Sequence, residues 1–389
     1  MNVAFVLLTY NPDEPAGIER GLEALAAGLR ANGHRAILIA AGPPDAADGP
    51  DLVRLSSLTL RRPMLFDDLP RLLTAPEAVC AEVGKLLGEH EIEVVCWADA
   101  VAGLGYLSPA PPGVRTVLMT YLARADRFMR TALGHDPEAV IAVSPFLVDE
   151  AAAAGLDTTS WYPLPNPLLH LHPRTAAVRR EELRRHGAVR TLSRPDPGKG
   201  IAPMLRALPR DFGRPVEVVL ASASFEMWPG MQDEVQRECR AIADGHPDIE
   251  ILDPLPWDEA QRFLADAALT MSPATWPETF GNVPAEALSV GTPVVGFALG
   301  HLPALVGGAG RLVKPAQAGT VREITEVRRS SWDGSGANDD FDRLWAAAID
   351  LLDDHDAYHA ASARGPLQTA GHSPTAVADE FVRLLGGLS

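Results

Sequence analysis

Cysteine is among the rarest residues of this sequence. Its three copies, Cys80, Cys96 and Cys239, lie far apart and form no CxxC or CxxH pair. This spacing argues against a zinc site or a disulfide framework and favours a reducing, cytoplasmic location. No apolar run approaches the roughly 20 residues that a membrane-spanning helix needs. The first eight residues lack the positive flank of a signal peptide and instead predict a strand.

Positive charge is scarce as well. The 389 residues include 34 lysines and arginines against 51 aspartates and glutamates, which is a formal net charge of −17. This balance argues against nucleic acid as the main partner and is compatible with a cationic small molecule. Only three of the basic residues are lysines, namely Lys85, Lys199 and Lys314. A lysine in so arginine-rich a chain is a candidate functional residue.

Hydrophobic patterning predicts strands that alternate with helices. The apolar run Val3–Leu8 is typical of a buried parallel strand. The next segment has leucines and isoleucine at helical spacing, ends at Asn32-Gly33 and leads to a second strand over 36–40, which completes a βαβ unit. Further strands are expected at 92–97, 116–119, 139–143, 216–220, 249–252, 268–271 and 293–297. The sequence therefore predicts an α/β protein with two Rossmann-like halves and with ligand bound in the cleft between them.

Composition changes mark the expected connections. A proline-rich stretch over 163–173 and an arginine-rich stretch over 174–190 are interpreted together as an interdomain linker. Residues 330–340 have the composition of a mobile surface loop, and residues 374–385 have a helical pattern.

The familiar motifs of phosphate binding and hydrolysis are missing. Neither Gly103-Leu104-Gly105 nor Gly308-Ala309-Gly310 is followed by the third glycine of the dinucleotide fingerprint, and Lys199 does not lie in a P-loop. There is no HExxH and no GxSxG. No Asp-x-Asp follows a convincing strand, so a dedicated magnesium–diphosphate site is not expected.

One constellation stands out after the strand at 268–271. Glu278 and Glu286 lie eight positions apart, with Gly281 between them. Gly281 allows a tight turn, so we expect Glu278 in a loop and Glu286 about one turn into a helix that starts near Asn282. Such a helix would direct free N–H groups at the region that Glu278 borders, which suits a diphosphate, with carboxylates available for sugar hydroxyls. The alternative is a surface loop followed by an ordinary amphipathic helix.

The stretch 277–295 resembles the Glu-x7-Glu signature of the retaining, two-domain (GT-B) glycosyltransferases of the large family 4 group. Its Pro-Glu-Thr-Phe-Gly string is similar to their E-(G/T)-F-G, and its Ala-Leu-Ser-Val-Gly-Thr-Pro-Val-Val string to their A-M-A-x-G-x-P-V-V. Other matching places follow in the same order as in the family: Ala16-Gly17, Gly33-His34, Val143-Ser144, Pro165-Asn166-Pro167, Ser193-Arg194 and Lys199-Gly200. The resemblance implies the GT-B fold, in which two Rossmann-like domains face an interdomain cleft. It also implies an acceptor-side domain over 1–168, a nucleotide-sugar-binding domain over 169–370, and a C-terminal helix within 371–389 that packs back on the first domain.

The resemblance implies roles for individual residues. Glu278 would bind donor sugar hydroxyls, and Glu286 would hold the ribose hydroxyls. Arg194 and Lys199 would neutralise the diphosphate and stabilise the leaving group without a metal. Gly17 would let the backbone approach the donor phosphate or the acceptor. The remaining donor contacts would come from the backbone near Phe280, Gly281, Asn282 and Val283.

The chain departs from the family pattern in three places. Ala16 stands where a second glycine is common, and Thr120-Tyr121 where many members have a histidine. The string Gly300-His301-Leu302-Pro303-Ala304 lacks the glutamate of the family's G-G-x-P-E loop. His301 and Tyr121 are therefore candidate donor or acceptor contacts. Other polar residues after strand ends, namely Asp99, Arg124 and Asp126, are weaker candidates.

The sequence thus predicts a retaining, metal-independent hexosyltransferase. It would move a hexose or amino-hexose from a nucleotide-sugar, UDP-GlcNAc or UDP-glucose, to a hydroxyl of a small molecule. The nucleotide-sugar is a co-substrate, and no cofactor is expected. The composition resembles that of actinobacterial proteins that decorate antibiotics, and a cationic, aminoglycoside-type acceptor would suit the charge of −17. Two alternatives stay open, a UDP-sugar 2-epimerase of similar fold and a non-catalytic nucleotide-sugar binder.

Overall fold

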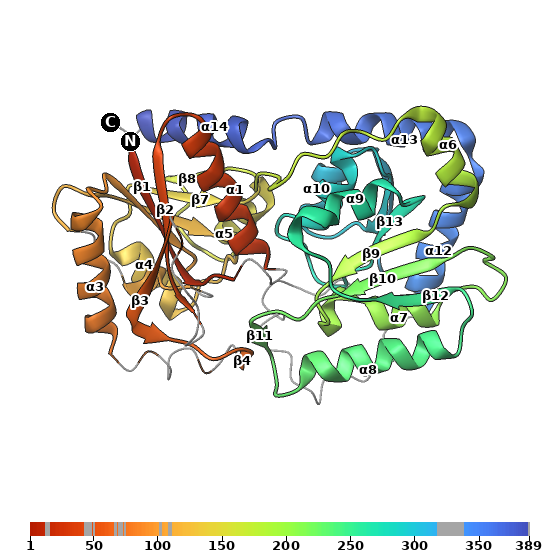
Figure 1. Cartoon of the computed structure of the whole chain (residues 1–389), viewed down its shortest axis with the longest axis horizontal. Helices are drawn as coiled ribbons and strands as arrows, with labels where there is room; N and C mark the ends of the chain where they lie inside the picture. Colours follow the sequence, from red (N-terminus) through yellow and green to blue (C-terminus); the bar gives the residue numbers. More distant parts are fainter. Residues whose placement is uncertain are drawn as a thin grey trace. The chain divides into compact units, whose positions relative to one another are not determined.

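A computed structural model describes residues 1–11, 16–42, 49, 51–65, 68, 73, 75–100, 103–107, 111–316 and 338–387. The chain divides into two compact units (Figure 1). Of the described residues, the N-terminal unit comprises those up to Leu169 together with the end of the chain from His372, and the C-terminal unit comprises those within His170–Gly371. None of the described helices is both long enough and apolar enough to cross a membrane.

The N-terminal unit is built on a seven-stranded sheet in the order β3-β2-β1-β5-β6-β7-β8, in which every pair of neighbours is parallel. The strand order reverses between β1 and β5, so the carboxyl ends of these two strands form the switch point where doubly wound sheets bind ligands. The strands are β1 (Asn2–Thr9), β2 (Arg35–Gly42), β3 (Leu52–Thr59), β5 (Val94–Ala98), β6 (Arg115–Thr120), β7 (Ala139–Ala142) and β8 (Trp161–Pro163), and a short β4 (Met64–Leu65) lies outside this sheet.

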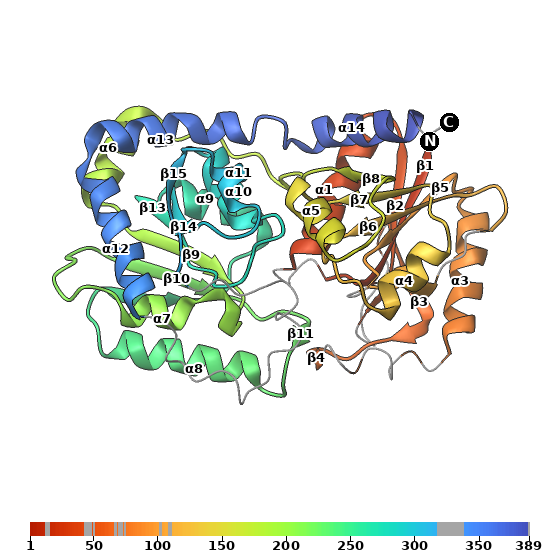
Figure 2. The same cartoon turned by 180° about the vertical axis from the view of Figure 1, so that it is seen from behind.

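Helices cover this sheet, and the last of them comes from the end of the chain. They are α1 (Gly17–Ala31), α3 (Pro76–Glu89), the 3₁₀ turn η2 (Gly105–Leu107), α4 (Arg127–Gly134), α5 (Pro145–Ala153) and α14 (Pro374–Gly386). Helix α14 lies beside α1 (Figure 2). A Cβ atom added to Gly28 of α1 would lie only 2.0 Å from the carbonyl oxygen of Pro374. Only glycine permits an approach this close.

The C-terminal unit holds a six-stranded sheet in the order β12-β10-β9-β13-β14-β15, also parallel throughout. Its switch point lies between β9 and β13. The strands are β9 (Val189–Ser193), β10 (Val216–Leu220), β12 (Ile249–Leu252), β13 (Leu269–Ser272), β14 (Val294–Phe297) and β15 (Gly310–Val313), and a short β11 (Phe225–Glu226) lies outside the sheet. Both units therefore have the doubly wound, Rossmann-like architecture that the alternating pattern predicts.

The helices of the C-terminal unit pack an apolar core against this sheet. Trp345 is buried at 1% exposure, and its indole N–H donates to the carbonyl of Met204 at 2.8 Å. Tyr358 is fully buried, and its hydroxyl donates to the carbonyl of Ala268 at 2.5 Å. The helices and 3₁₀ turns are α6 (Ala177–His186), η3 (Pro197–Lys199), α7 (Ile201–Arg206), α8 (Met231–Asp244), η4 (Trp257–Glu259), α9 (Ala260–Ala265), α10 (Asn282–Ser289), α11 (Leu302–Val306), α12 (Asn338–Asp353) and α13 (His355–Gln368).

The arginine-rich stretch 174–190 is not a linker, contrary to the prediction from sequence. It contains helix α6 and the start of β9, and both belong to the C-terminal unit. Arg180 shows the reason. Its guanidinium is buried and donates to the carbonyls of Ala265 (2.8 Å) and Ala267 (2.7 Å) at the end of α9. Ala265 is the last residue of α9 and Ala267 lies just beyond it, where carbonyl groups have no partner within the helix. The arginine therefore completes a helix end within the fold.

The loop expected over 330–340 lies mostly outside the described residues. Its last residues, 338–340, form the first turn of α12. The expected C-terminal helix is confirmed as α14.

Candidate functional site

Two loops meet at the switch point of the C-terminal unit. One follows β9 over residues 194–200, and the other follows β13 over residues 273–281. Strands β9 and β13 are paired, with Leu269 opposite Val189. The carboxyl ends of neighbouring parallel strands lie at the same edge of the sheet, so the residues that follow them lie close together although they are far apart in sequence.

Close backbone contacts hold these two loops together. The carbonyl of Gly198 accepts from the backbone N–H of Thr275 at 2.9 Å, which joins the two loops. Within the first loop, the backbone N–H of Gly198 donates to the carboxylate of Asp196 at 2.9 Å. A Cβ atom at Gly198 would lie 2.0 Å from the ring of Trp276. The first loop therefore needs a residue without a side chain where it crosses the indole.

Replacing Gly198 by alanine is expected to lower the free energy of unfolding by about 1–3 kcal/mol, because the methyl group must displace a packed indole. Chemical denaturation measures this change. Gly371→Ala is a matched control in the same unit, since a Cβ there meets nothing within 4 Å. Equal stability of the two variants would contradict the close packing of the loops.

The loops bring Lys199 and Glu278 together. The Nζ of Lys199 lies 2.5 Å from Oε1 of Glu278, and the two side chains are 28% and 19% exposed. The sequence proposed both residues, but 79 positions separate them and no spacing pattern links them. Arg194 instead forms an ion pair with Asp196 at 3.6 Å and is 41% exposed. Lys199 is therefore the more enclosed of the two predicted cations.

Helix α10 begins where the sequence predicts it, at Asn282. Gly281 precedes it with φ +96°, a backbone conformation that favours glycine. The first bond of the helix runs from the N–H of Ala285 to the carbonyl of Gly281, at 2.9 Å. The N–H groups of Asn282 and Val283 stand before this bond, outside the helical ladder, and carry the positive end of the helix dipole.

Glu286 is the fifth residue of α10 and is buried, at 4% exposure. The prediction that Glu278 lies in a loop and Glu286 about one turn into a helix is thus confirmed. Whether Glu286 contacts a ribose stays a prediction.

His301 lies next to the Glu278 loop. Its backbone N–H donates to the carbonyl of Glu278 at 2.8 Å, and its ring stacks on Phe280 at a centroid distance of 6.0 Å. Burial lowers the pKa of His301, so its imidazole is neutral at pH 7. Within the described part of the chain, its Nδ1 is buried without a hydrogen-bond partner.

The N-terminal unit has its own polar residues at strand ends. Asp99 follows β5, is fully buried, and accepts the backbone N–H groups of Tyr121 at 2.7 Å and Leu122 at 3.1 Å. Burial, followed by the charges of Asp99 and Glu19, raises the pKa of Tyr121 far above its usual value. The hydroxyl of Tyr121 is therefore a neutral donor, and it has no hydrogen-bond partner among the described residues.

Other N-terminal candidates have structural roles. Asp126 caps helix α4 by accepting the N–H groups of Phe128 and Met129, both at 3.0 Å, and its carboxylate also pairs with Arg124 at 3.3 Å. Gly17 is the first residue of α1, the helix that follows β1.

Taken together, the C-terminal site offers an ammonium group, an adjacent carboxylate, helix N–H groups and a neutral imidazole. Such a set can bind a ligand that carries both anionic oxygens and hydroxyl groups.

The chain matches two sequence families whose descriptions agree with a site of this chemistry. Residues 15–168 match the family described as Glycosyltransferase Family 4, and residues 187–327 match the family described as Glycosyl transferases group 1. The chain is a GT-B glycosyltransferase. The first match covers most of the N-terminal unit, and the second covers the loops that carry Lys199 and Glu278. No curated protein sequence matches the chain.

Solved structures share the fold of this glycosyltransferase over its full length. Sucrose-phosphate synthase from Thermosynechococcus elongatus superposes with a TM-score of 0.72 at 16% identity, covering 100% of this chain and 99% of that one. Anabaena HepE in complex with UDP superposes with a TM-score of 0.68 at 18% identity, covering 100% of both chains. AviGT4, a glycosyltransferase of avilamycin A biosynthesis, gives a TM-score of 0.56 at 18% identity, covering 100% and 98%.

Proposed function

We propose that this glycosyltransferase is a retaining enzyme that transfers a hexose or amino-hexose from a UDP-sugar to a hydroxyl group of a small molecule. The C-terminal unit would bind the donor, and the N-terminal unit would bind the acceptor. The observation that carries the proposal is the Lys199–Glu278 pair, 2.5 Å apart on the two loops of a topological switch point.

The pair suits a nucleoside diphosphate-sugar because such a donor has two chemically different parts. The ammonium of Lys199 would stabilise the negative charge that builds on the departing diphosphate. The carboxylate of Glu278 accepts hydrogen bonds and would take them from sugar hydroxyls. The N–H groups of Asn282 and Val283 would contact further donor oxygens, as the start of a helix commonly does with phosphate.

The nucleotide is proposed as uridine because HepE of the same fold was solved with UDP and with UDP-glucose. Glu286 is proposed to hold the ribose, because it is a buried acid on the helix that begins at the donor loop. The neutral imidazole of His301 is proposed as a further hydrogen-bonding contact to the sugar, because its Nδ1 has no hydrogen-bond partner among the described residues.

The acceptor is proposed as a cationic antibiotic precursor of the aminoglycoside type. The net charge of −17 favours a positively charged small molecule. In the N-terminal unit, the hydroxyl of Tyr121 is a candidate acceptor contact near the charges of Asp99 and Glu19. AviGT4, which shares the fold, is involved in avilamycin A biosynthesis, and the antibiotic role is proposed here by analogy with it.

A product assay tests the proposal. The enzyme is incubated with UDP-glucose or UDP-GlcNAc and a panel of aminocyclitols, and products are identified by mass spectrometry and NMR. We expect UDP together with a glycoside whose anomeric configuration equals that of the donor. An inverted glycoside would contradict retention. A new free sugar or nucleotide-sugar would indicate an epimerase, and binding without any product would indicate a non-catalytic binder.

Activity is expected to survive excess EDTA, because Lys199 and Arg194 supply the positive charge that a metal would otherwise bring to the diphosphate. The measurement is the rate of UDP release before and after chelation, with Mg²⁺ and Mn²⁺ added back in parallel. A strict requirement for either ion would show that the two cations do not suffice.

A further inference from the structure

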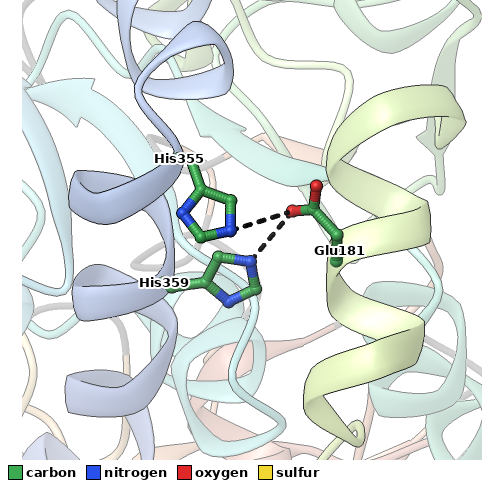
Figure 3. Close-up of side chains that lie close together, drawn as sticks. All are labelled: Glu181, His355 and His359. Atoms are coloured by element: carbon green, nitrogen blue, oxygen red, sulfur yellow. Dashed lines mark hydrogen bonds and ion pairs between the residues drawn. The ribbon is translucent and has the colours of Figure 1, made fainter.

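A second cluster of ionisable side chains lies apart from the donor loops, between helices α6 and α13 of the C-terminal unit. It consists of Glu181 on α6 and of His355 and His359 on α13 (Figure 3). None of the three takes part in the site described above. Their ligand atoms all lie within 4.8 Å of one another.

The two histidines stand four positions apart on one helix, so their rings project from the same face. Figure 3 shows both rings directed at Glu181, and its dashed lines join each ring to the same carboxylate oxygen. Oε2 of Glu181 lies 2.9 Å from Nε2 of His359 and 3.9 Å from Nε2 of His355. The ring centroids of the two histidines are 4.6 Å apart.

These distances suit a shared metal ion. Ligand atoms about 2.0–2.2 Å from one zinc ion, at tetrahedral angles, lie roughly 3.5 Å from each other. The two separations between Glu181 and the histidines, 2.9 and 3.9 Å, lie on either side of that value. All three ligand atoms lie within 4.8 Å of one another, so movements of these side chains toward a common point would bring them to bonding geometry. Water would fill the remaining position.

The ligand types narrow the choice of ion. Two imidazoles and one carboxylate favour a borderline ion such as Zn²⁺ over Mg²⁺ or Ca²⁺, which prefer oxygen ligands. Glu181 also accepts hydrogen bonds from Arg184 at 2.7 and 2.9 Å and from Arg185 at 2.6 Å. These guanidinium groups orient the carboxylate, and their positive charge weakens the attraction for any cation. The imidazoles must then supply most of the bonding.

We propose that Glu181, His355 and His359 form a zinc site that links helix α6 to helix α13. The scarcity of cysteine argues against a cysteine-ligated zinc site in this chain, but the three ligands proposed here include no cysteine. The site would be structural, because it joins two helices on which none of the proposed donor contacts lies. Bound zinc would stabilise the folded C-terminal unit, since a ligand that binds only the native state shifts the unfolding equilibrium.

Calorimetric titration of the full chain with Zn²⁺, after removal of metal by chelation, tests the proposal. We expect a saturable site in the wild type. His355→Ala and His359→Gln are each expected to weaken its binding by at least about tenfold, because each removes a ligand. His186→Ala is the matched control, since this histidine is exposed at the end of α6 and has no part in the cluster. The zinc affinity of the His186→Ala variant should equal that of the wild type.

Two further measurements identify the site directly. Zinc should shift the imidazole nitrogen resonances of His355 and His359 in long-range ¹H–¹⁵N spectra, and it should raise the thermal unfolding temperature of the wild type but not of His355→Ala. Both variants should keep the far-ultraviolet circular dichroism of the wild type. The proposal is overturned if zinc at micromolar concentrations does not bind, or if both variants bind it as the wild type does.

Discussion

Lys199→Ala is expected to lower the turnover number by about 30- to 1000-fold, the effect of removing one preorganised charged contact from a transition state. The ammonium would neutralise the diphosphate as the sugar leaves, so its loss affects the reaction more than donor binding. Lys85→Ala is a matched control, because Lys85 is 72% exposed and pairs with Glu89 on its own helix. Steady-state rates of UDP release for the two variants measure the difference. Near wild-type turnover for Lys199→Ala would remove this residue from the reaction.

A double variant separates two explanations of such a loss. Lys199 could act on the diphosphate itself, or only by orienting Glu278 through their 2.5 Å contact. In the second case, Lys199→Ala would have little further effect once Glu278→Gln is present. We expect a substantial remaining effect. Arg194→Ala should act in the same direction as Lys199→Ala but less strongly, because its side chain is 41% exposed and already pairs with Asp196.

The strand and helix pattern of the donor region could be predicted from sequence because each step has a local signal. The apolar run before Ser272 marks β13, and Gly281 marks the turn into α10. The Lys199–Glu278 contact has no local signal. It depends on the pairing of β9 with β13, and strand order is a property of the whole sheet.

Strand β9 was missed for a physical reason. Its residue Arg190 lies in an arginine-rich stretch that has the composition of a linker. In the fold, this guanidinium bonds Glu217 at 2.7 Å and lies 4.4 Å from the ring centroid of Phe263. Partners from other strands and helices thus make a charged residue acceptable inside the sheet. Composition alone could not reveal them, and the same holds for the buried Arg180 of α6.

The second large effect is expected at Glu286. If its carboxylate accepts hydrogen bonds from both ribose hydroxyls, Glu286→Ala should weaken UDP binding by roughly 1.5–3 kcal/mol, the range for hydrogen bonds to a charged group. Isothermal titration calorimetry measures this loss directly. Glu250→Ala is a suitable control, because Glu250 is an exposed acid on β12 of the same unit and should leave UDP binding unchanged.

Titration with 2′-deoxy-UDP shows whether the loss arises at the ribose. This ligand already lacks one of the two hydroxyls, so Glu286→Ala should weaken its binding much less than that of UDP. The difference between the two losses is a coupling energy that is independent of general damage to α10. Glu286 is 4% exposed, so a purely internal role is the competing explanation. In that case both ligands would lose affinity equally and the ligand-free protein would also lose stability, because a buried helix residue had lost its packing. A coupling energy of zero would therefore end the ribose assignment, while a positive one would tie this buried acid to the nucleotide.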